Sequence, residues 1–532
     1  MGGATRMDAA QTLQKLMHFL RGGDDSWTLR ASLFLAGVVL VGILTIAVHM
    51  AAGLTLPAPW GDEAYFLWQA RGFERWNDFI APEIDPDRPL LLLPYGYPLL
   101  MGIVFKVFGF SLEIARAVSL VATLAGFGLL ATAMRGRKIA AVSLILIGAF
   151  LLNGHFVVMA NNARMEAVMF AIICGALLLV QNNRHWVALG LLGGSAVIHP
   201  NAMLMGAPVF FYAIFAGKLW KNWPSRTGMI VIGIGVAAWA AQALYIFTHW
   251  AAFEHDLAYR LSETTSASKG ASQFGGWHAV GLVSIFAIWA LALWRKVPVA
   301  HLTAFAVGAW LMSRVREEQW YDVFNDFAYL LAALALIEIL VKDVRRRYPN
   351  QALISLGASL ALVAVAGLFF LKTGRIEGPK GYLQELNVDG MVIADDVPYF
   401  TPEDRAVLEA YMNGIQENGL TTVELYPWGD TLLFPENDPD TVRFQIPYFD
   451  PDYVASTRNW PWGYGPTYGE TPTVYILRTS KYQPRWLDER FDRLMKRASE
   501  RAGGRAPEVI HSRNDTEIWY AFPTIAEAPP AP

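Results

Sequence analysis

The chain contains little charge and almost no cysteine. Only 17% of its residues are charged while 54% are hydrophobic, which is too apolar for an ordinary soluble enzyme. With 532 residues, the chain is also too long for one simple domain. The formal net charge of −3 lacks the basic excess that a nucleic-acid-binding surface needs, so we expect no nucleic-acid partner. Cys174 is the single cysteine, which excludes an intramolecular disulfide. The composition predicts a polytopic α-helical membrane protein.

Apolar runs of spanning length recur along the first 371 residues. A helix needs roughly 20 residues to cross the hydrocarbon, and fewer when neighbouring helices bury it. No small-residue cleavage site follows the first run, so we interpret it as a retained span after a cytoplasmic N-terminal segment, residues 1–30. On this length criterion we expect about eleven transmembrane helices, near residues 31–50, 111–134, 139–156, 165–181, 186–204, 203–217, 227–248, 278–294, 298–313, 327–341 and 352–371.

Basic side chains mark alternate connections between these runs. The positive-inside rule assigns such connections to the cytoplasm and the remaining loops to the other side. We therefore expect an integral protein of a bacterial inner (cytoplasmic) membrane, with everything after about residue 372 on the periplasmic (extracytoplasmic) side. The basic residues are Arg135, Arg137, Lys138, Arg184, Lys218, Lys221, Arg226, Arg295, Lys296, Lys342, Arg345, Arg346 and Arg347.

One further apolar stretch, residues 89–108, does not fit this alternation. Counting it as a span would place Arg135 and Lys138 outside and reverse every later loop. Pro94, Gly96 and Pro98 also interrupt its helix. We interpret it as an interfacial or re-entrant segment, with juxtamembrane helices, that closes a first external loop at residues 51–110.

The residues after 371 change character and predict a separate α/β domain, residues 372–532. "GMVIADDVPYF" and "TVYILRTS" have the pattern of short buried strands, and "EVIHSRNDTEIWYAF" that of a hairpin turning at Asn514-Asp515. Thr401-Pro402 opens a helix that we expect to stop by Gly419. The stretch "NWPWGYGPTYGE", residues 459–470, suits a carbohydrate-binding loop or an aromatic loop packed on the membrane surface.

Two carboxylates follow the first span, in the stretch "WGDEAYFLW". Asp62 and Glu63 stand between Trp60 and the aromatic residues Tyr65 and Trp68, in the aromatic belt expected at a membrane interface. A carboxylate in such a place tends to have a function or a partner. The alternative for each charge at a span end is a solvated or anchoring residue.

A second charged pair, Arg164 and Glu166, opens the fourth expected span in "NNARMEAVMF". These side chains should face the protein interior or a polar cavity, and a structural ion pair stays an open alternative. Arg314 and Arg316 have the same relation to a later span. Several guanidinium groups at span ends on one side suit a phosphate or pyrophosphate group, because the planar fork binds oxyanions through two hydrogen bonds.

These side chains together indicate transfer of a lipid-linked sugar. The lipid tail would lie among the spans and its phosphate would face the arginines. A carboxylate near the acceptor hydroxyl could take its proton as general base. The arginines would stabilise the charge that develops on the departing phosphate.

The same features resemble the glycosyltransferase C superfamily, in its protein O-mannosyltransferase and aminoarabinose transferase branch. The similarity rests on the Asp62-Glu63 pair, the first external loop that closes on Tyr97-Pro98-Leu99, and the Ala-Arg-x-Glu motif at 163–166, and it covers roughly residues 30–345. The resemblance implies a polyprenyl-phosphate sugar donor and a glycan, lipid or protein acceptor, with the active site on the extracytoplasmic face.

The resemblance also implies residue roles. Asp62 would be the catalytic base, and Glu166 a second acidic residue of the catalytic site. Tyr95-Gly96-Tyr97 stands where many relatives have a basic residue or histidine before Pro-Pro-Leu, so the resemblance does not extend to the donor-phosphate contact there. The stretch "RVREEQWYDVFNDF" departs from the late external loop of relatives, so the acceptor or sugar can differ. The candidates for substrate binding are Glu63, Arg88, Tyr97, His155, Arg164, His255, Arg314 and Arg316.

Metal use stays unassigned from the sequence. Oxygen and nitrogen ligands are available, but no spacing forms a recognised site, so we expect no obligatory metal and leave a divalent cation as an alternative. His199-Pro200 is interpreted as the end or kink of a span, with a contact role as the alternative. The available ligands are His155, Glu166, Glu254, His255 and Asp256.

Two other functions remain open. A flippase or transporter of a polar lipid would also bind a charged headgroup, but transporters tend to have repeated halves and broken helices, and the sequence shows neither. A polysaccharide polymerase or ligase would keep the enzyme class and use a lipid-pyrophosphate donor. The leading hypothesis is an integral membrane glycosyltransferase that moves a sugar from a polyprenyl-phosphate donor to a hydroxyl of an extracytoplasmic acceptor.

Overall fold

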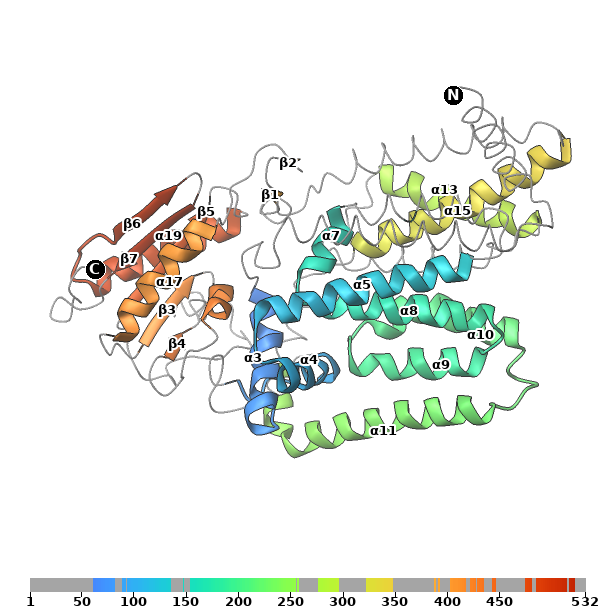
Figure 1. The fold of residues 1–532 in the computed structure, drawn as a ribbon, viewed down its shortest axis with the longest axis horizontal. Coiled ribbons are helices and arrows are strands. Elements are labelled where there is room, and N and C mark those ends of the chain that lie inside the picture. The colour runs from blue at the N-terminus through green and yellow to red at the C-terminus, as the bar shows by residue number, and fades with distance from the viewer. Residues whose placement is uncertain are drawn as a thin grey trace, which may run out of the picture.

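The structure, a computed structural model, consists of a helical part followed by a small sheet domain (Figure 1). The expected spans at 31–50, 298–313 and 352–371, most of the one at 139–156 and the aromatic loop at 459–470 lie outside the described residues. The described residues are 61–81, 89–91, 93–134, 147, 154–254, 256–257, 276–295, 322–347, 387–388, 391–392, 402–417, 422–426, 428–434, 443–445, 474–480, 485–513 and 516–521.

The loop expected to be the first external one contains two helices packed on each other, α3 (Gly61–Trp76) and α4 (Gly96–Phe108). Gly102 allows their close approach, because a Cβ there would lie 2.7 Å from Cδ1 of Phe73. Pro98 lies in the first turn of α4, where a missing N–H breaks no helical bond. Within the segment 89–108, the helix α4 is only 13 residues long, which is too short to cross the hydrocarbon.

Two neighbouring helices that run parallel, α5 (Leu112–Met134) and α8 (Met165–Gln181), form the centre of the helical part. Gly126 permits this contact, since a Cβ there would lie 2.5 Å from the ring of Phe170. The rings of Phe127, Phe156, Phe170 and Phe327 contact one another in the core, and they come from α5, α7 (Gly154–Asn161), α8 and α15 (Asp322–Arg347).

The bounds of the described helices follow the apolar runs closely, with two exceptions. The run expected at 186–204 is helical only to Gly194 and continues as a 3-10 turn to Val197. Pro200 explains why the helix does not continue to residue 204, because proline has no N–H to donate and disfavours helical geometry in the residue before it. The run expected at 327–341 begins earlier, at Asp322. The remaining helices are α9 (His185–Gly194), η2 (Ser195–Val197), α10 (Ala202–Gly217), α11 (Arg226–Thr248) and α13 (Gly276–Trp294).

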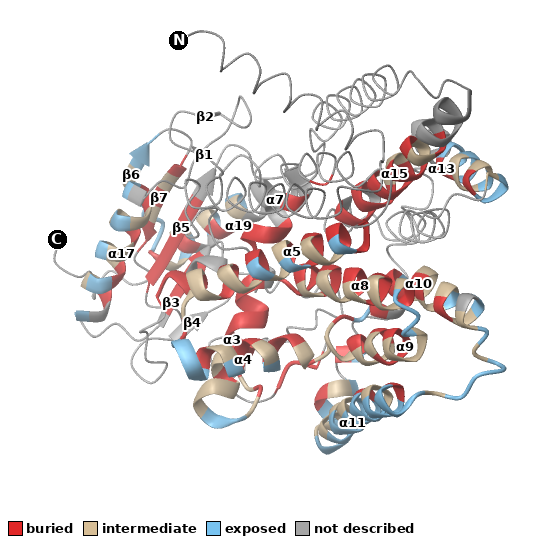
Figure 2. Cartoon of the chain, turned by 45° about the vertical axis from the view of Figure 1, so that its right-hand side comes forward, coloured by how far each residue is buried: buried red, intermediate tan, exposed pale blue. Residues whose placement is uncertain are grey.

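The helix α11 exposes apolar side chains along most of its length, as its pale blue colour in Figure 2 shows. Ile234, Leu244 and Phe247 are 64%, 65% and 73% exposed, and a soluble protein rarely leaves such a surface uncovered. Among the described helices, α5 and α11 are long and apolar enough to cross a membrane, and five shorter helices are also apolar. These features fit a helical membrane protein; the number of about eleven spans stays a prediction from run length.

The C-terminal domain is a five-stranded mixed sheet with a helix on each face. The strand order is β4-β3-β5-β7-β6, in which β4, β3 and β5 run parallel and β7 runs antiparallel to both of its neighbours. Leu408 and Met412 of α17 pack on one face, and Leu494 and Ala498 of α19 on the other. The elements are α17 (Pro402–Glu417), β3 (Thr422–Tyr426), η5 (Trp428–Leu433), β4 (Arg443–Gln445), β5 (Val474–Ser480), α19 (Arg485–Arg501), β6 (Glu508–Arg513) and β7 (Thr516–Ala521).

Several local expectations for this domain are confirmed. The two strands of the expected hairpin, on either side of residues 514–515, pair antiparallel, with Arg513 opposite Thr516. The helix α17 begins at Pro402 and ends at Glu417. The expected strand in "GMVIADDVPYF" is described only at Met391–Val392, which pairs with Asn387–Val388 in a separate two-stranded sheet. The strands β3 and β4 and the helix α19 were not expected.

The contact between α9 and α11 yields a stability prediction. A Cβ on Gly190 would lie 2.9 Å from the backbone nitrogen of Ile232, so Gly190→Ala should push the helices apart. We expect a cost of about 1–3 kcal/mol, measured as a lower melting temperature in detergent. Gly193→Ala is the matched control, because a Cβ there meets nothing within 4 Å; equal melting temperatures for the two variants would contradict the packing.

Candidate active site

The candidate site begins at the first turn of α3, which contains both carboxylates of the Asp62-Glu63 pair. The side chain of Glu63 is fully buried. It accepts hydrogen bonds from Nε and Nη2 of Arg116, at 3.0 and 2.8 Å, and from the backbone N–H of Ala163 at 2.6 Å. For Asp62 the structure describes the backbone only, as the second residue of the helix.

Arg116 belongs to α5 and is also fully buried. Its guanidinium group meets the Glu63 carboxylate through two parallel hydrogen bonds, the geometry in which such pairs are strongest. A charge buried among apolar helices needs a partner of this kind. The sequence analysis did not select Arg116, although an arginine inside the apolar run "LEIARAV" was a usable signal.

The second charged pair lies at the start of α8. Arg164 occupies the N-cap position with an extended backbone. Its Nη2 lies 2.9 Å from Oε1 of Glu166 and its Nε lies 3.2 Å from Oε2. The structural ion pair, left open by the sequence, is therefore present, and Glu166 also suits the positive end of the helix dipole.

His199 completes this second pair. Its Nε2 lies 3.7 Å from Oε1 of Glu166, and its Nδ1 accepts the backbone N–H of Asn201 at 3.0 Å. Because Nδ1 accepts, the proton of a neutral ring lies on Nε2 and faces the carboxylate. The sequence favoured a helix end or kink at His199-Pro200, and the 3-10 turn after α9 does end before it, at Val197. The segment that follows brings the ring of His199 to Glu166.

These two clusters meet in one buried region. The backbone of Ala163, one residue before Arg164, binds Glu63 and so joins the start of α8 to α3. The fully buried Tyr97 of α4 belongs to the same apolar cluster as Ala163 and Met165, which flank Arg164, and its ring centroid lies 5.5 Å from that of Phe66 on α3. The start of α4 also touches η2, since a Cβ on Gly96 would lie 2.4 Å from the carbonyl oxygen of Val197.

The structure thus brings together four predicted site residues, Glu63, Tyr97, Arg164 and Glu166, and adds two others, Arg116 and His199. His155 lies in α7, and the structure describes only the backbone of this residue. The roles of Asp62 and of all the predicted residues stay predictions. Those that lie outside the described residues are Arg88, His255, Arg314 and Arg316.

Asp256, offered above as a metal ligand, has a different contact in the structure. It is buried, and its Oδ2 accepts the backbone N–H of Leu91 at 2.6 Å, which fastens the first external loop to the chain segment after α11. Within the described residues, no group of three His, Cys, Asp or Glu side chains is arranged to hold a metal ion.

The site lies at one end of the helical part. Figure 1 shows α3 between the helices and the sheet domain, while the connection from α10 to α11 lies at the far end. That connection contains the basic residues Lys218, Lys221 and Arg226. Site and basic connection therefore lie at opposite ends, an arrangement compatible with the expected orientation.

No protein-family model matches the chain, and no curated protein matches it. Two crystal structures of ArnT from Cupriavidus metallidurans are similar to it. The structure bound to undecaprenyl phosphate has a TM-score of 0.47 and 14% sequence identity, and the apo structure has 0.45 and 13%; each likeness covers 95% of this chain and 100% of the ArnT chain. The two structural neighbours agree with the resemblance predicted from the sequence; with TM-scores below 0.5, the likeness assigns no role to this chain.

The Glu63–Arg116 pair yields a second stability prediction. Arg116→Met leaves the Glu63 carboxylate buried without its guanidinium, so we expect a loss of about 3–5 kcal/mol in the free energy of unfolding. The double variant Glu63→Gln/Arg116→Met should recover part of this loss, because a neutral amide still accepts the N–H of Ala163. Both are measured by thermal unfolding in detergent.

Lys496→Met is the control for this pair. It removes a cation that pairs with Glu500 on an exposed helix surface, where ion pairs contribute little. A loss for Arg116→Met no larger than that of this control would contradict the buried-pair interpretation.

Proposed function

We propose that the protein is an integral membrane glycosyltransferase that moves a sugar from a polyprenyl-phosphate donor to a hydroxyl of an extracytoplasmic acceptor. The observation that supports this most is the buried charged cluster beneath the first turn of α3. It lies beside Asp62 at one end of an apolar helical part. A membrane protein that only needed stability would gain little from two buried ion pairs, because apolar side chains of similar volume stabilise as well.

Asp62 is the proposed general base. Its neighbour Glu63 is held by three hydrogen bonds, which fixes the helical turn to which Asp62 belongs. The first turn of a helix stabilises a carboxylate in its charged form, the form that can accept a proton. This division of roles leaves Asp62 for chemistry and Glu63 for holding the turn.

In the proposed reaction, the acceptor hydroxyl oxygen attacks the anomeric carbon of the sugar. The hydroxyl proton passes to the Asp62 carboxylate. The bond between the anomeric carbon and the phosphate oxygen breaks, and its electron pair leaves with the polyprenyl phosphate. Guanidinium groups would stabilise the charge on that phosphate, with Arg88, Arg314 and Arg316 as the candidates.

Arg164 has a narrower role in this proposal. Its guanidinium group already binds Glu166 through two nitrogens, so a donor phosphate would have to share it with that carboxylate. We assign to Arg164 and His199 the task of holding Glu166 in place at the start of α8. Glu166 is then the second carboxylate of the site, fixed between a guanidinium and an imidazole group.

The base assignment is tested with Asp62→Asn. The amide cannot accept the acceptor proton, so transfer of labelled sugar should fall by at least about 100-fold while the protein still folds and inserts. Glu74→Gln is the control, because Glu74 lies on the same helix and pairs with Arg71 at its partly exposed surface. Transfer at the wild-type rate by the Asp62 variant would remove Asp62 from the mechanism.

The donor class is tested separately with the wild-type protein in liposomes. We expect transfer from polyprenyl-monophosphate sugars and none from polyprenyl-pyrophosphate sugars. The reverse preference would favour a polymerase or ligase. Movement of a labelled lipid across the bilayer without sugar transfer would favour a flippase.

A further inference from the structure

The C-terminal domain touches the helical part next to the candidate site. The indole Nε1–H of Trp68 on α3 donates to Oγ1 of Thr431 in η5 at 2.9 Å, and both side chains are buried. Leu432, the next residue of η5, belongs to the apolar core of the first external loop. Trp68 is also stacked on Phe110, with ring centroids 5.1 Å apart. A buried hydrogen bond and apolar packing thus hold η5 beside α3.

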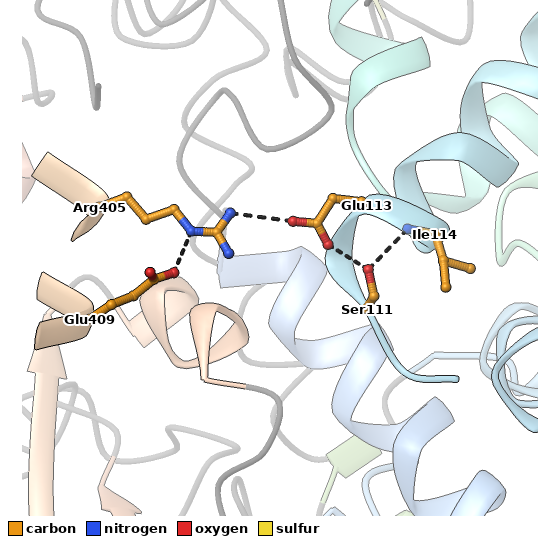
Figure 3. Close-up of polar contacts among 5 residues, drawn as sticks. All are labelled: Ser111, Glu113, Ile114, Arg405 and Glu409. Atoms are coloured by element: carbon orange, nitrogen blue, oxygen red, sulfur yellow. Dashed lines mark hydrogen bonds and ion pairs between the residues drawn. The ribbon is translucent and has the colours of Figure 1, made fainter. Parts of the chain in front are cut away.

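A second polar contact joins the domain to the beginning of α5 (Figure 3). Nη1 of Arg405 on α17 lies 3.3 Å from Oε1 of Glu113, and its Nε lies 2.5 Å from Oε1 of Glu409. The other oxygen of Glu113 accepts from Ser111, whose Oγ accepts the backbone N–H of Ile114 at 3.3 Å. Arg405 therefore binds the turn that caps α5.

Partial burial acts against the charge of this guanidinium group, yet the two carboxylates outweigh it. Hydrogen bonds and charge attraction from Glu409 and Glu113 raise the pKa of Arg405 above its ordinary value. The two carboxylates therefore hold the guanidinium group of this contact in its charged form.

The two contacts lie on the two helices that the buried ion pair joins. Trp68 follows Glu63 on α3 by little more than one turn, and Glu113 precedes Arg116 on α5 by about one turn. The domain, α3 and α5 therefore form a closed ring of contacts: η5 on α3, α3 on α5 through Glu63 and Arg116, and α5 back on α17. A linker alone would leave such a domain mobile.

We propose that Thr431 and Arg405 are positioning residues of the candidate site. They brace α3 against α5 from outside the membrane part and so fix the turn that contains Asp62. This inference rests on the proposed function for its catalytic consequence. Neither residue touches the reacting groups; each acts through a helix that does.

The experiment uses the full chain in nanodiscs with Thr431→Val and Arg405→Gln. Valine keeps the volume of threonine but cannot accept the indole hydrogen bond, and glutamine removes the charge at a half-buried position. Arg513→Gln is the matched control, because Arg513 pairs with Glu403 of the same helix α17 without bridging to α5. Two quantities are measured: hydrogen exchange of 61–76 and 112–120, and the steady-state kinetics of sugar transfer.

We expect both test variants to exchange faster in both segments, while the control matches wild type. We also expect kcat to fall about tenfold or more, since small misplacements of catalytic groups are costly, with little change in the KM for the donor. Unchanged exchange overturns the brace. Faster exchange with wild-type kcat overturns the positioning role.

The exchange measurement also separates the two proposals. Faster exchange in the test variants, in a preparation whose wild type transfers no sugar, supports the brace and removes the proposed function. Transfer by wild type with unchanged exchange in the variants supports the function and removes the brace.

Discussion

The buried ion pair between Glu63 and Arg116 joins the two helices on which the candidate site depends. Neither charge can stay in an apolar interior without the other, so α3 and α5 must meet at this point and in this orientation. The third hydrogen bond on Glu63, from Ala163, brings the start of α8 to the same place. The positions of Tyr97, Arg164, Glu166 and the turn before His199 follow from that meeting.

The buried charges of the cluster and a reacting carboxylate must meet different requirements. The charges of the cluster are already satisfied by one another, which makes it a rigid support. A reacting carboxylate has the opposite requirement, because it must reach a proton that arrives with the substrate. In the proposed mechanism, an Asp-Glu pair in one helical turn meets both requirements with adjacent residues: Glu63 is bound into the protein, and Asp62, next to it, takes the proton. Because the two residues are adjacent in one helical turn, the hydrogen bonds that fix Glu63 also fix the backbone of Asp62.

Local features of the sequence predicted the elements well. The run that gives α8 was placed at 165–181, and the paired strands β6 and β7 were expected as a hairpin, because hydrophobic run length and turn chemistry act over a few residues. The pairing of Glu63 with Arg116 was not predictable in this way, since the partners are 53 positions apart. His199 was interpreted as part of a span end or kink because of the proline beside it. Its contact with Glu166 was not predictable, because it depends on how two helices pack. The charged pair Arg164 and Glu166 was found because ionisable residues in an apolar run are costly.

The contact of Trp68 with Thr431 joins positions 363 residues apart, and that of Glu113 with Arg405 joins positions 292 apart. During synthesis, α3 leaves the ribosome on the order of tens of seconds before its last partner exists. These two contacts can therefore form only after α17 and η5 have been synthesised, when the apolar helices described here already exist. A chain that stops before residue 402 contains every apolar helix described here and neither of the two outer contacts, so the order of translation itself decides when this end of the molecule becomes complete.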